Sequence, residues 1–195
     1  MRVDQNEFFR QATLRLCGTL DIKKALDQCR QYLERFFPIL RMELSLVETG
    51  LSAMKFIAHS TRYQDYELDR IPLSDAARAQ IKQDLMEHRS VIIVNDSETN
   101  EVTRLLNNNL ANISTSSWLA LFLEIDSQQL GVISIMAEGK NRFTKYHLRL
   151  FSLLHDPFAM AMSNALGYQD VVMLKDTQTE LTQLPQFQTK LRKMR

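Results

Sequence analysis

The chain has 195 residues, of which 45% are hydrophobic, and its 24 Lys and Arg residues nearly cancel its 23 Asp and Glu residues. This length and composition predict one domain of roughly 150 residues with terminal extensions. Because no basic field covers the chain, direct nucleic-acid binding is not expected. No apolar run approaches the roughly 20 residues that a membrane span requires, so no membrane association is expected either.

The start of the chain and its cysteines bear on the cellular compartment. Met1 is followed by polar and charged residues instead of the apolar stretch of a signal peptide. The two cysteines, Cys17 and Cys29, do not make a disulfide framework, which favours a reducing compartment. We therefore expect a cytoplasmic protein.

Two amphipathic helices are predicted at the start of the chain. The first carries apolar residues from Phe8 to Leu16 and ends at Gly18, a common type of helix terminator. The second begins at the N-cap Asp21 and ends at Pro38.

A hairpin and a loop follow these helices. Apolar residues alternate on either side of Thr49-Gly50, which predicts strands at about 42–46 and 54–57. The polar, aromatic stretch 60–72 is interpreted as a functional loop.

The middle of the chain predicts a helix, a strand and a polar connection. Ser74 is the predicted N-cap of a helix that runs to about His88, and residues 91–94 predict a short buried strand. The polar stretch 95–117 contains a short helical piece around 102–106.

The stretch 118–137 is expected to form the centre of the fold. Two apolar runs flank polar residues at 126–129, which predicts an antiparallel hairpin, and neither face of it carries a run of polar side chains. Both faces are therefore expected to be covered. With the turn at Ser127-Gln128, one face is predicted to carry Leu119, Leu121, Leu123, Ile125, Leu130, Val132, Ser134 and Met136, and the other Trp118, Ala120, Phe122, Glu124, Gly131, Ile133, Ile135 and Ala137.

Side-chain size suggests what covers each face. The small side chains of Ala120, Gly131 and Ala137 would let helices approach closely, so the terminal helices are expected on that face. Loops and shorter helices would then cover the opposite face, and a ligand cavity is expected beneath them.

The last helix is predicted to begin at the N-cap Thr144 and to continue to about Lys175, with a kink at Pro157. Its apolar residues recur at alternating spacings of three and four, a heptad-like seam. This seam would either cover the sheet or, with the first helices, pair with a second copy in a parallel homodimer. The residues assigned to this dimer or signalling surface are Phe8, Phe9, Phe151, Phe158, Met162, Ala165 and Val172.

The succession of elements is therefore helix, helix, strand, strand, helix, strand, short helix, strand, strand, long helix. Consecutive strands without a crossover helix favour a mostly antiparallel sheet. The predicted class is α+β, with the N- and C-terminal helices on one face of the sheet and short helices and loops on the other.

Three segments carry a resemblance to a known family. They are LGVISI at 130–135, Phe143-Thr144, and the helix 148–166 with its apolar residues and the sequence NAL at its end. With these segments, the chain from Leu14 to Leu166 resembles a GAF domain. The resemblance implies a GAF-like (PAS-like) central antiparallel sheet and a role in sensing.

A narrower resemblance involves both ends of this region. FFR at 8–10, ATLRLCGTLDI at 12–22, FFP at 36–38 and MSNAL at 162–166 resemble the N-terminal sensory domain of sigma-54-dependent transcriptional activators. In that family the domain controls an attached AAA+ ATPase, which is followed by a DNA-binding helix-turn-helix. The sequence has no GxxxxGK[ST] phosphate loop, so the ATPase is not in this chain.

The resemblance also implies a division of the chain. Residues 1–166 would be the sensor domain with its N-terminal helices. Residues 167–195 would be an exit helix and linker leading to the missing ATPase, whether the chain is a stand-alone protein or a fragment.

No catalytic constellation is visible, and the chain is not expected to be an enzyme. The closest histidines, His147 and His155, lie about 12 Å apart by helix rise, too far to share a metal, so no metal site is expected. The cofactor is left unknown. Among ligands of GAF domains, a covalent bilin is disfavoured because both cysteines precede the pocket region, and a cyclic nucleotide is disfavoured because no acidic pair follows Phe143.

A small anion or metabolite remains open as the ligand. Donors in the predicted loops and residues of the predicted cavity face are the candidates, although the loop residues could equally be ordinary solvated side chains. The candidate pocket residues are His59, Arg62, Tyr63, Tyr66, Arg104, Leu121, Ser134 and Met136. The alternative function is a dimerisation or protein-interaction module without a ligand.

Overall fold

The computed structural model describes residues 3–48, 50, 52–62, 69–109, 115–126 and 129–168. Its centre is a six-stranded sheet with the strand order β3-β2-β1-β6-β5-β4, and every neighbouring pair is antiparallel. The strands are β1 (Arg41–Val47), β2 (Ala53–Thr61), β3 (Arg70–Pro72), β4 (Val91–Val94), β5 (Ser116–Asp126) and β6 (Gln129–Glu138).

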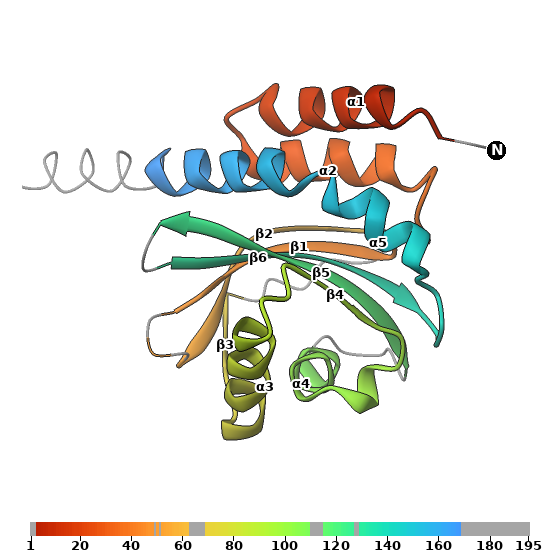
Figure 1. Ribbon diagram of the computed structural model, residues 1–195. Coiled ribbons are helices and arrows are strands. Elements are labelled where there is room, and N and C mark those ends of the chain that lie inside the picture. The colour runs from red at the N-terminus through yellow and green to blue at the C-terminus, as the bar shows by residue number, and fades with distance from the viewer. Residues whose placement is uncertain are drawn as a thin grey trace, which may run out of the picture.

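Helices cover both faces of this sheet (Figure 1). Helices α1, α2 and α5, with a last helix at 155–168, lie on one face, and α3, α4 and the 3-10 turn η2 lie on the other. This arrangement confirms the predicted α+β class. The helices are α1 (Gln5–Cys17), α2 (Ile22–Leu33), α3 (Asp75–Met86), η2 (Ser97–Thr99), α4 (Glu101–Asn109) and α5 (Lys145–Ser152).

The helix boundaries follow from local side-chain chemistry. Asp21, Ser74 and Thr144 are the N-caps of α2, α3 and α5, and each accepts a hydrogen bond from a backbone N–H of the first turn, as predicted. Helix α1 ends at Gly18, also as predicted. Helix α2 ends at Leu33, earlier than the sequence suggested.

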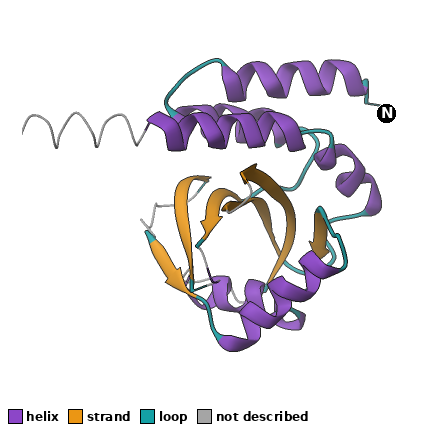
Figure 2. Cartoon of the chain, turned by 60° about the vertical axis from the view of Figure 1, so that its left-hand side comes forward, coloured by secondary structure: helices purple, strands orange, loops and turns teal. Residues whose placement is uncertain are grey.

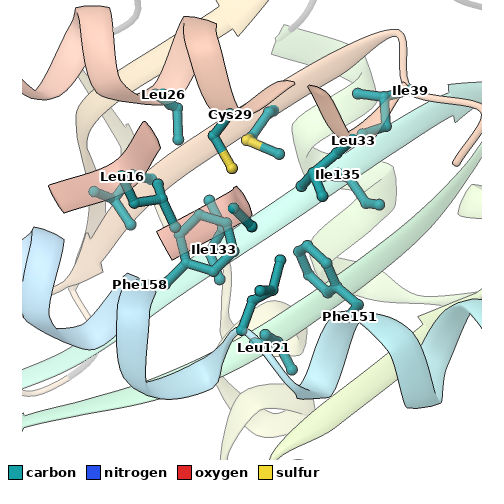
Figure 3. Packing of buried hydrophobic residues seen from close by; sticks show 14 of the residues in the cluster. Leu16, Leu26, Cys29, Leu33, Ile39, Leu121, Ile133, Ile135, Phe151 and Phe158 are labelled. Atoms are coloured by element: carbon teal, nitrogen blue, oxygen red, sulfur yellow. The ribbon is translucent and has the colours of Figure 1, made fainter. Parts of the chain in front are cut away.

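The helical face of the sheet carries a closed apolar core (Figure 3). Phe158 packs beside Ile133, and Phe151 lies near Ile135 and Leu121. Each of these five side chains is at most 1% exposed. Burial of a side chain of this size stabilises the fold by about 1.5–3 kcal/mol, so this layer holds the terminal helices firmly on the sheet.

The predicted faces of the central hairpin were right for β6 and wrong for β5. Asp126 pairs with Gln129, and Glu124 pairs with Leu130, the next residue of β6. Ile125, between them, is therefore an extra residue in β5 without a partner in this register. A slip of one residue moves every side chain of a strand to the other face. Leu121 therefore lies in the core under the helices, although it was predicted on the cavity face.

The face of β6 follows the prediction. Gly131 and Ala137 lie on the helical side, whereas Ser134 and Met136 lie on the side of α3 and α4. Because of the one-residue slip, Ala120 lies with Ser134 on the side of α3 and α4. It was predicted on the side of the terminal helices.

The last helix is broken, where a continuous helix with a kink was predicted. Helix α5 ends at Ser152, a turn occupies 153–154, and a new helix runs over 155–168. Pro157 thus lies in the first turn of the new helix, where its missing N–H removes no intrahelical hydrogen bond. The predicted continuation to Lys175 lies outside the described residues.

The stretch 60–72 is only partly a loop. Strand β2 continues to Thr61, and β3 pairs with β2 through Ile71 opposite Met54. The prediction missed β3 because three residues ending in a proline give little alternating pattern.

No helix in the described parts of the chain combines the length and apolar character needed to cross a membrane.

A candidate ligand cavity

A cavity lies between the sheet and the pair of helices α3 and α4. Figure 2 shows the sheet curving around this side of the molecule, with the two helices closing it. The cavity has a volume of about 60 Å³, and since one water needs about 10–15 Å³ on the same measure, it has room for roughly four to six atoms of water size. Its lining is Ser45, Val47, Met54, Ile81, Asp84, Ile92, Val94, Asn100, Val102, Thr103, Leu106, Trp118, Ala120, Phe122, Val132 and Ser134.

Small side chains in the middle of the sheet make room for the cavity. Ala120 of β5 lies directly opposite Ser134 of β6, and both line the cavity. The next pair of the same face, Phe122 and Val132, is larger. The floor is therefore hollowed at the Ala120–Ser134 pair, while the bulkier side chains around it bound the space.

A buried polar network holds α4 against β5 at one wall of the cavity. The Asn107 side chain donates to Ser97 Oγ at 2.8 Å and accepts from Ser116 Oγ at 2.8 Å and from Trp118 Nε1 at 3.3 Å. Trp118 Nε1 also lies 2.7 Å from Ser116 Oγ. This network orients the indole ring that lines the cavity and ties the covering helix to the floor.

Asp84 of α3 is an acidic residue of the cavity lining. Its side chain is 5% exposed. Gln80 Nε2 donates to it at 3.3 Å, and Arg89 Nη1 donates at 3.4 Å. Burial raises the pKa of Asp84 above its ordinary value, against the opposing effects of the Gln80 hydrogen bond and the Arg89 charge.

A buried ion pair lies on the same face of the sheet beside the cavity. Arg41 Nε donates to Glu43 Oε1, and the two side chains are 6% and 1% exposed. Burial raises the pKa of Glu43, while Arg41 and His59 act in the opposite direction. Within the described residues, Arg41 Nη2 is buried without a hydrogen-bond partner. Glu43 lies opposite Ser134 in the sheet, so the pair adjoins the cavity without lining it.

The structure brings one of the predicted pocket residues, Ser134, into the cavity lining. Met136 lies on the same face, next to the cavity rather than in its lining, and Leu121 lies on the opposite face. Arg104 makes an ion pair with Glu101 of its own helix.

The two described donors of the 59–66 region, His59 and Arg62, do not line the cavity. Arg62 makes an ion pair with Glu34 just beyond α2, and its side chain is half exposed. His59 lies on β2 opposite Glu43 and is half-buried. Tyr63 and Tyr66 lie outside the described residues.

Most of the predicted dimer residues are buried inside the chain. Phe8, Phe151, Phe158, Met162 and Ala165 are at most 5% exposed and belong to the core against the sheet. They cannot contact a second copy in this arrangement, so the heptad-like seam covers the sheet. Phe9 is 41% exposed, and Val172 lies outside the described residues.

Sequence reasoning missed Asp84 and the Ala120–Ser134 pair. Asp84 occurs in a polar helical stretch where an acidic residue looks like part of a solvated face, and only the packing of α3 over the sheet shows otherwise. In the described part of the chain, no three His, Cys, Asp or Glu side chains are grouped closely enough to hold a metal ion.

Comparison with known structures identifies the fold. The GAF domain of an Acinetobacter phosphoenolpyruvate-protein phosphotransferase is 10% identical, with a TM-score of 0.61 over 87% of this chain and 99% of that chain. The phycoerythrobilin-bound GAF domain of a cyanobacterial phytochrome is 13% identical, with a TM-score of 0.59 over 85% of this chain and 97% of that one. This chain has the GAF-domain fold.

A third similar structure comes from an enzyme. The free methionine-R-sulfoxide reductase of Neisseria meningitidis, in complex with its substrate, is 15% identical, with a TM-score of 0.60 over 86% of this chain and 96% of that one. No protein-family model and no curated protein sequence matches the chain. At these identities the likeness establishes the fold alone.

Proposed function

We propose that this chain is the small-molecule-sensing GAF domain of a sigma-54-dependent transcriptional regulator and controls an attached AAA+ ATPase. The observation that carries the sensing role is the mostly apolar cavity on the sheet face opposite the terminal helices. Mostly apolar cavities with a few convergent polar groups are the usual form of small-molecule sites. Two proteins with the same fold, the phytochrome domain and the reductase, bind small molecules.

A short connection from the cavity to the helical layer supports a signalling role. Val94 lines the cavity, and the next residue, Asn95, forms two hydrogen bonds with the backbone of Phe143. Asn95 Nδ2 donates to Phe143 O at 2.9 Å, and Phe143 N donates to Asn95 Oδ1 at 3.0 Å. Phe143 directly precedes the N-cap of α5. A shift of β4 on ligand binding would therefore reach the start of α5 through the Asn95 side chain alone.

The regulator context rests on sequence resemblance at both ends of the domain. In this proposal the protein is cytoplasmic, and the helix at 155–168 passes the signal to the ATPase. In the full-length regulator, deletion of this domain should change the response to the inducer. A normal response after deletion would contradict this part of the proposal.

The ligand test compares two variants of similar chemistry. Ala120→Leu fills the cavity, so ligand-induced stabilisation should disappear, while the free energy of unfolding changes by less than about 1.5 kcal/mol because the added carbons enter empty space. Ala58→Leu adds the same atoms to the closed core under the helices, where overpacking should cost about 1–3 kcal/mol.

The measurement is a thermal-shift screen of small metabolites and anions on the wild-type protein and both variants. A ligand at one hundred times its Kd adds about 2.7 kcal/mol to stability. The proposal predicts compounds that stabilise the wild-type and Ala58→Leu proteins but not Ala120→Leu. It is contradicted if every stabilising compound acts equally on all three.

Enzymatic reduction in the cavity is a candidate suggested by the reductase fold. Thiol chemistry requires an accessible thiolate. Cys29 is fully buried in the core under the helices, where burial raises its pKa, and Cys17 lies in α1 on the same side of the sheet. These are the two cysteines of the chain, and the cavity is on the opposite side. We therefore assign the cavity to binding rather than to thiol catalysis.

A ligand-free dimerisation module is the second candidate function. Large apolar side chains are exposed on the helical layer, with Phe9 at 41%, Leu14 at 56% and Met160 at 57%. Under our proposal the sensor is also a homodimer, and these residues, rather than the buried seam, would meet the second copy. Light scattering that finds a monomer at high concentration would reject the homodimer. A dimer that no compound stabilises would favour the ligand-free module.

A further inference from the structure

Asp84 is the one charged residue among the described side chains that line the cavity. The surrounding walls are largely apolar, and the Asp84 side chain is 5% exposed. A carboxylate in such surroundings needs a compensating charge or several strong hydrogen bonds, because removing it from water is costly.

The resident partners of Asp84 satisfy it poorly. Gln80 and Arg89 donate at 3.3 and 3.4 Å, beyond the usual range for N–H···O bonds. Arg89 makes its shorter ion pair with Glu87, and its side chain is 50% exposed. The local acidic charge of Asp84 and Glu87 therefore exceeds the single positive charge of Arg89.

The position of Asp84 on α3 adds to the negative potential. Asp84 lies in the last turn of α3, at the partially negative end of the helix dipole, where its own carbonyl accepts a hydrogen bond from Arg89 N at 3.1 Å. No basic residue occupies this turn. Burial is the main cause of the upward shift of the Asp84 pKa, and the Gln80 hydrogen bond and the Arg89 charge offset it only in part. Both the Asp84 carboxylate and the C-terminal end of α3 would attract a cation in the cavity.

The size and lining of the cavity limit what that cation can be. About 60 Å³ admits roughly four to six non-hydrogen atoms, and walls such as Phe122 and Val132 suit an aliphatic body. Building on the proposed sensing function, we propose that the cavity takes a small primary ammonium compound, with its ammonium group on Asp84 and an aliphatic body of about four carbons against the apolar walls.

Three probes of nearly equal size test this assignment by isothermal titration calorimetry at pH 7: n-butylammonium, 1-butanol and butyrate. The ammonium should bind about tenfold or more tighter than the alcohol, and the carboxylate should bind most weakly. Asp84→Asn should weaken n-butylammonium about tenfold or more, since a hydrogen bond between charged groups is lost. Asp75→Asn is the matched control on the same helix, because the Asp75 side chain is 91% exposed, and it should leave the affinity unchanged.

The comparison of probes on the wild-type protein needs no variant, so a folding defect in Asp84→Asn would not obscure the result. The assignment is overturned if 1-butanol or butyrate binds at least as tightly as n-butylammonium, if none of the three binds, or if a folded Asp84→Asn protein keeps the wild-type affinity. In each case the sensing function itself is still judged by the metabolite screen with Ala120→Leu. A screen without cavity-dependent ligands would overturn both.

Discussion

Replacing Asn107 by alanine tests whether the polar network at the cavity wall holds α4 on the sheet. Asn107 is 7% exposed and takes part in three hydrogen bonds, with Ser97, Ser116 and Trp118. Each contributes a net of about 1 kcal/mol. Because the indole keeps its bond to Ser116, only the bonds to Ser97 and Ser116 are counted as lost, which amounts to about 2 kcal/mol. Ser97 and Ser116 are fully buried and would lose a partner each, which raises the expected loss to about 2–4 kcal/mol.

The assay is urea unfolding followed by the fluorescence of Trp118, the single tryptophan of the chain, and by circular dichroism. The matched control is Asn109→Ala, two residues along the same helix. Asn109 is exposed and donates one hydrogen bond to Leu105 O at 2.8 Å, so its loss should stay within about 0.5 kcal/mol. If Asn107→Ala reduced the free energy of unfolding by less than about 1 kcal/mol, or by no more than the control, the network would not be what holds α4 on the sheet.

Two further variants probe the connection to α5. Asn95→Ala removes both hydrogen bonds to Phe143 and should cost about 1–3 kcal/mol in the free energy of unfolding, while a ligand found in the screen should bind but no longer shift the amide signals of α5 in NMR spectra. His147 Nδ1 accepts from Thr144 N, and burial lowers the pKa of His147 below 6.5, so the folded state binds fewer protons than the unfolded state. The stability that His147 contributes should be present above pH 6.5 and lost as the pH falls below it, and His147→Gln, which retains a capping side chain, should remove this dependence in thermal unfolding scans from pH 7.5 to 5. Unchanged pH dependence in His147→Gln would refute this role.

The sheet and its flanking helices could largely be predicted because their signals are local. Caps such as Asp21, Ser74 and Thr144 and the apolar runs of the central hairpin specify elements within a few residues. The face of β5 could not be predicted in the same way. One extra residue at Ile125 moves the preceding side chains of β5 to the opposite faces of the sheet. A bulge of this kind leaves no clear signature in the apolar pattern.

The cavity was harder to predict than the fold because it depends on contacts between distant segments. Ala120 and Ser134 create space only because the register pairs them, and Asp84 faces that space only because α3 packs over the sheet. The heptad-like seam was compatible with two uses, and the sequence holds no information on whether a sheet or a second chain lies opposite. The burial of Phe158 and Met162 decides for the sheet.

In the proposed mechanism, the helical layer senses a ligand in the cavity. The most direct test of this mechanism is a titration of the wild-type protein, followed by NMR, with the compound that gives the largest cavity-dependent stabilisation. The indole N–H of Trp118 reports the cavity, and the amides of Phe143 and His147 report the start of α5. All three signals should shift together and saturate at the same ligand concentration. Saturable binding that shifts the indole signal but leaves the α5 amides unchanged would contradict this coupling.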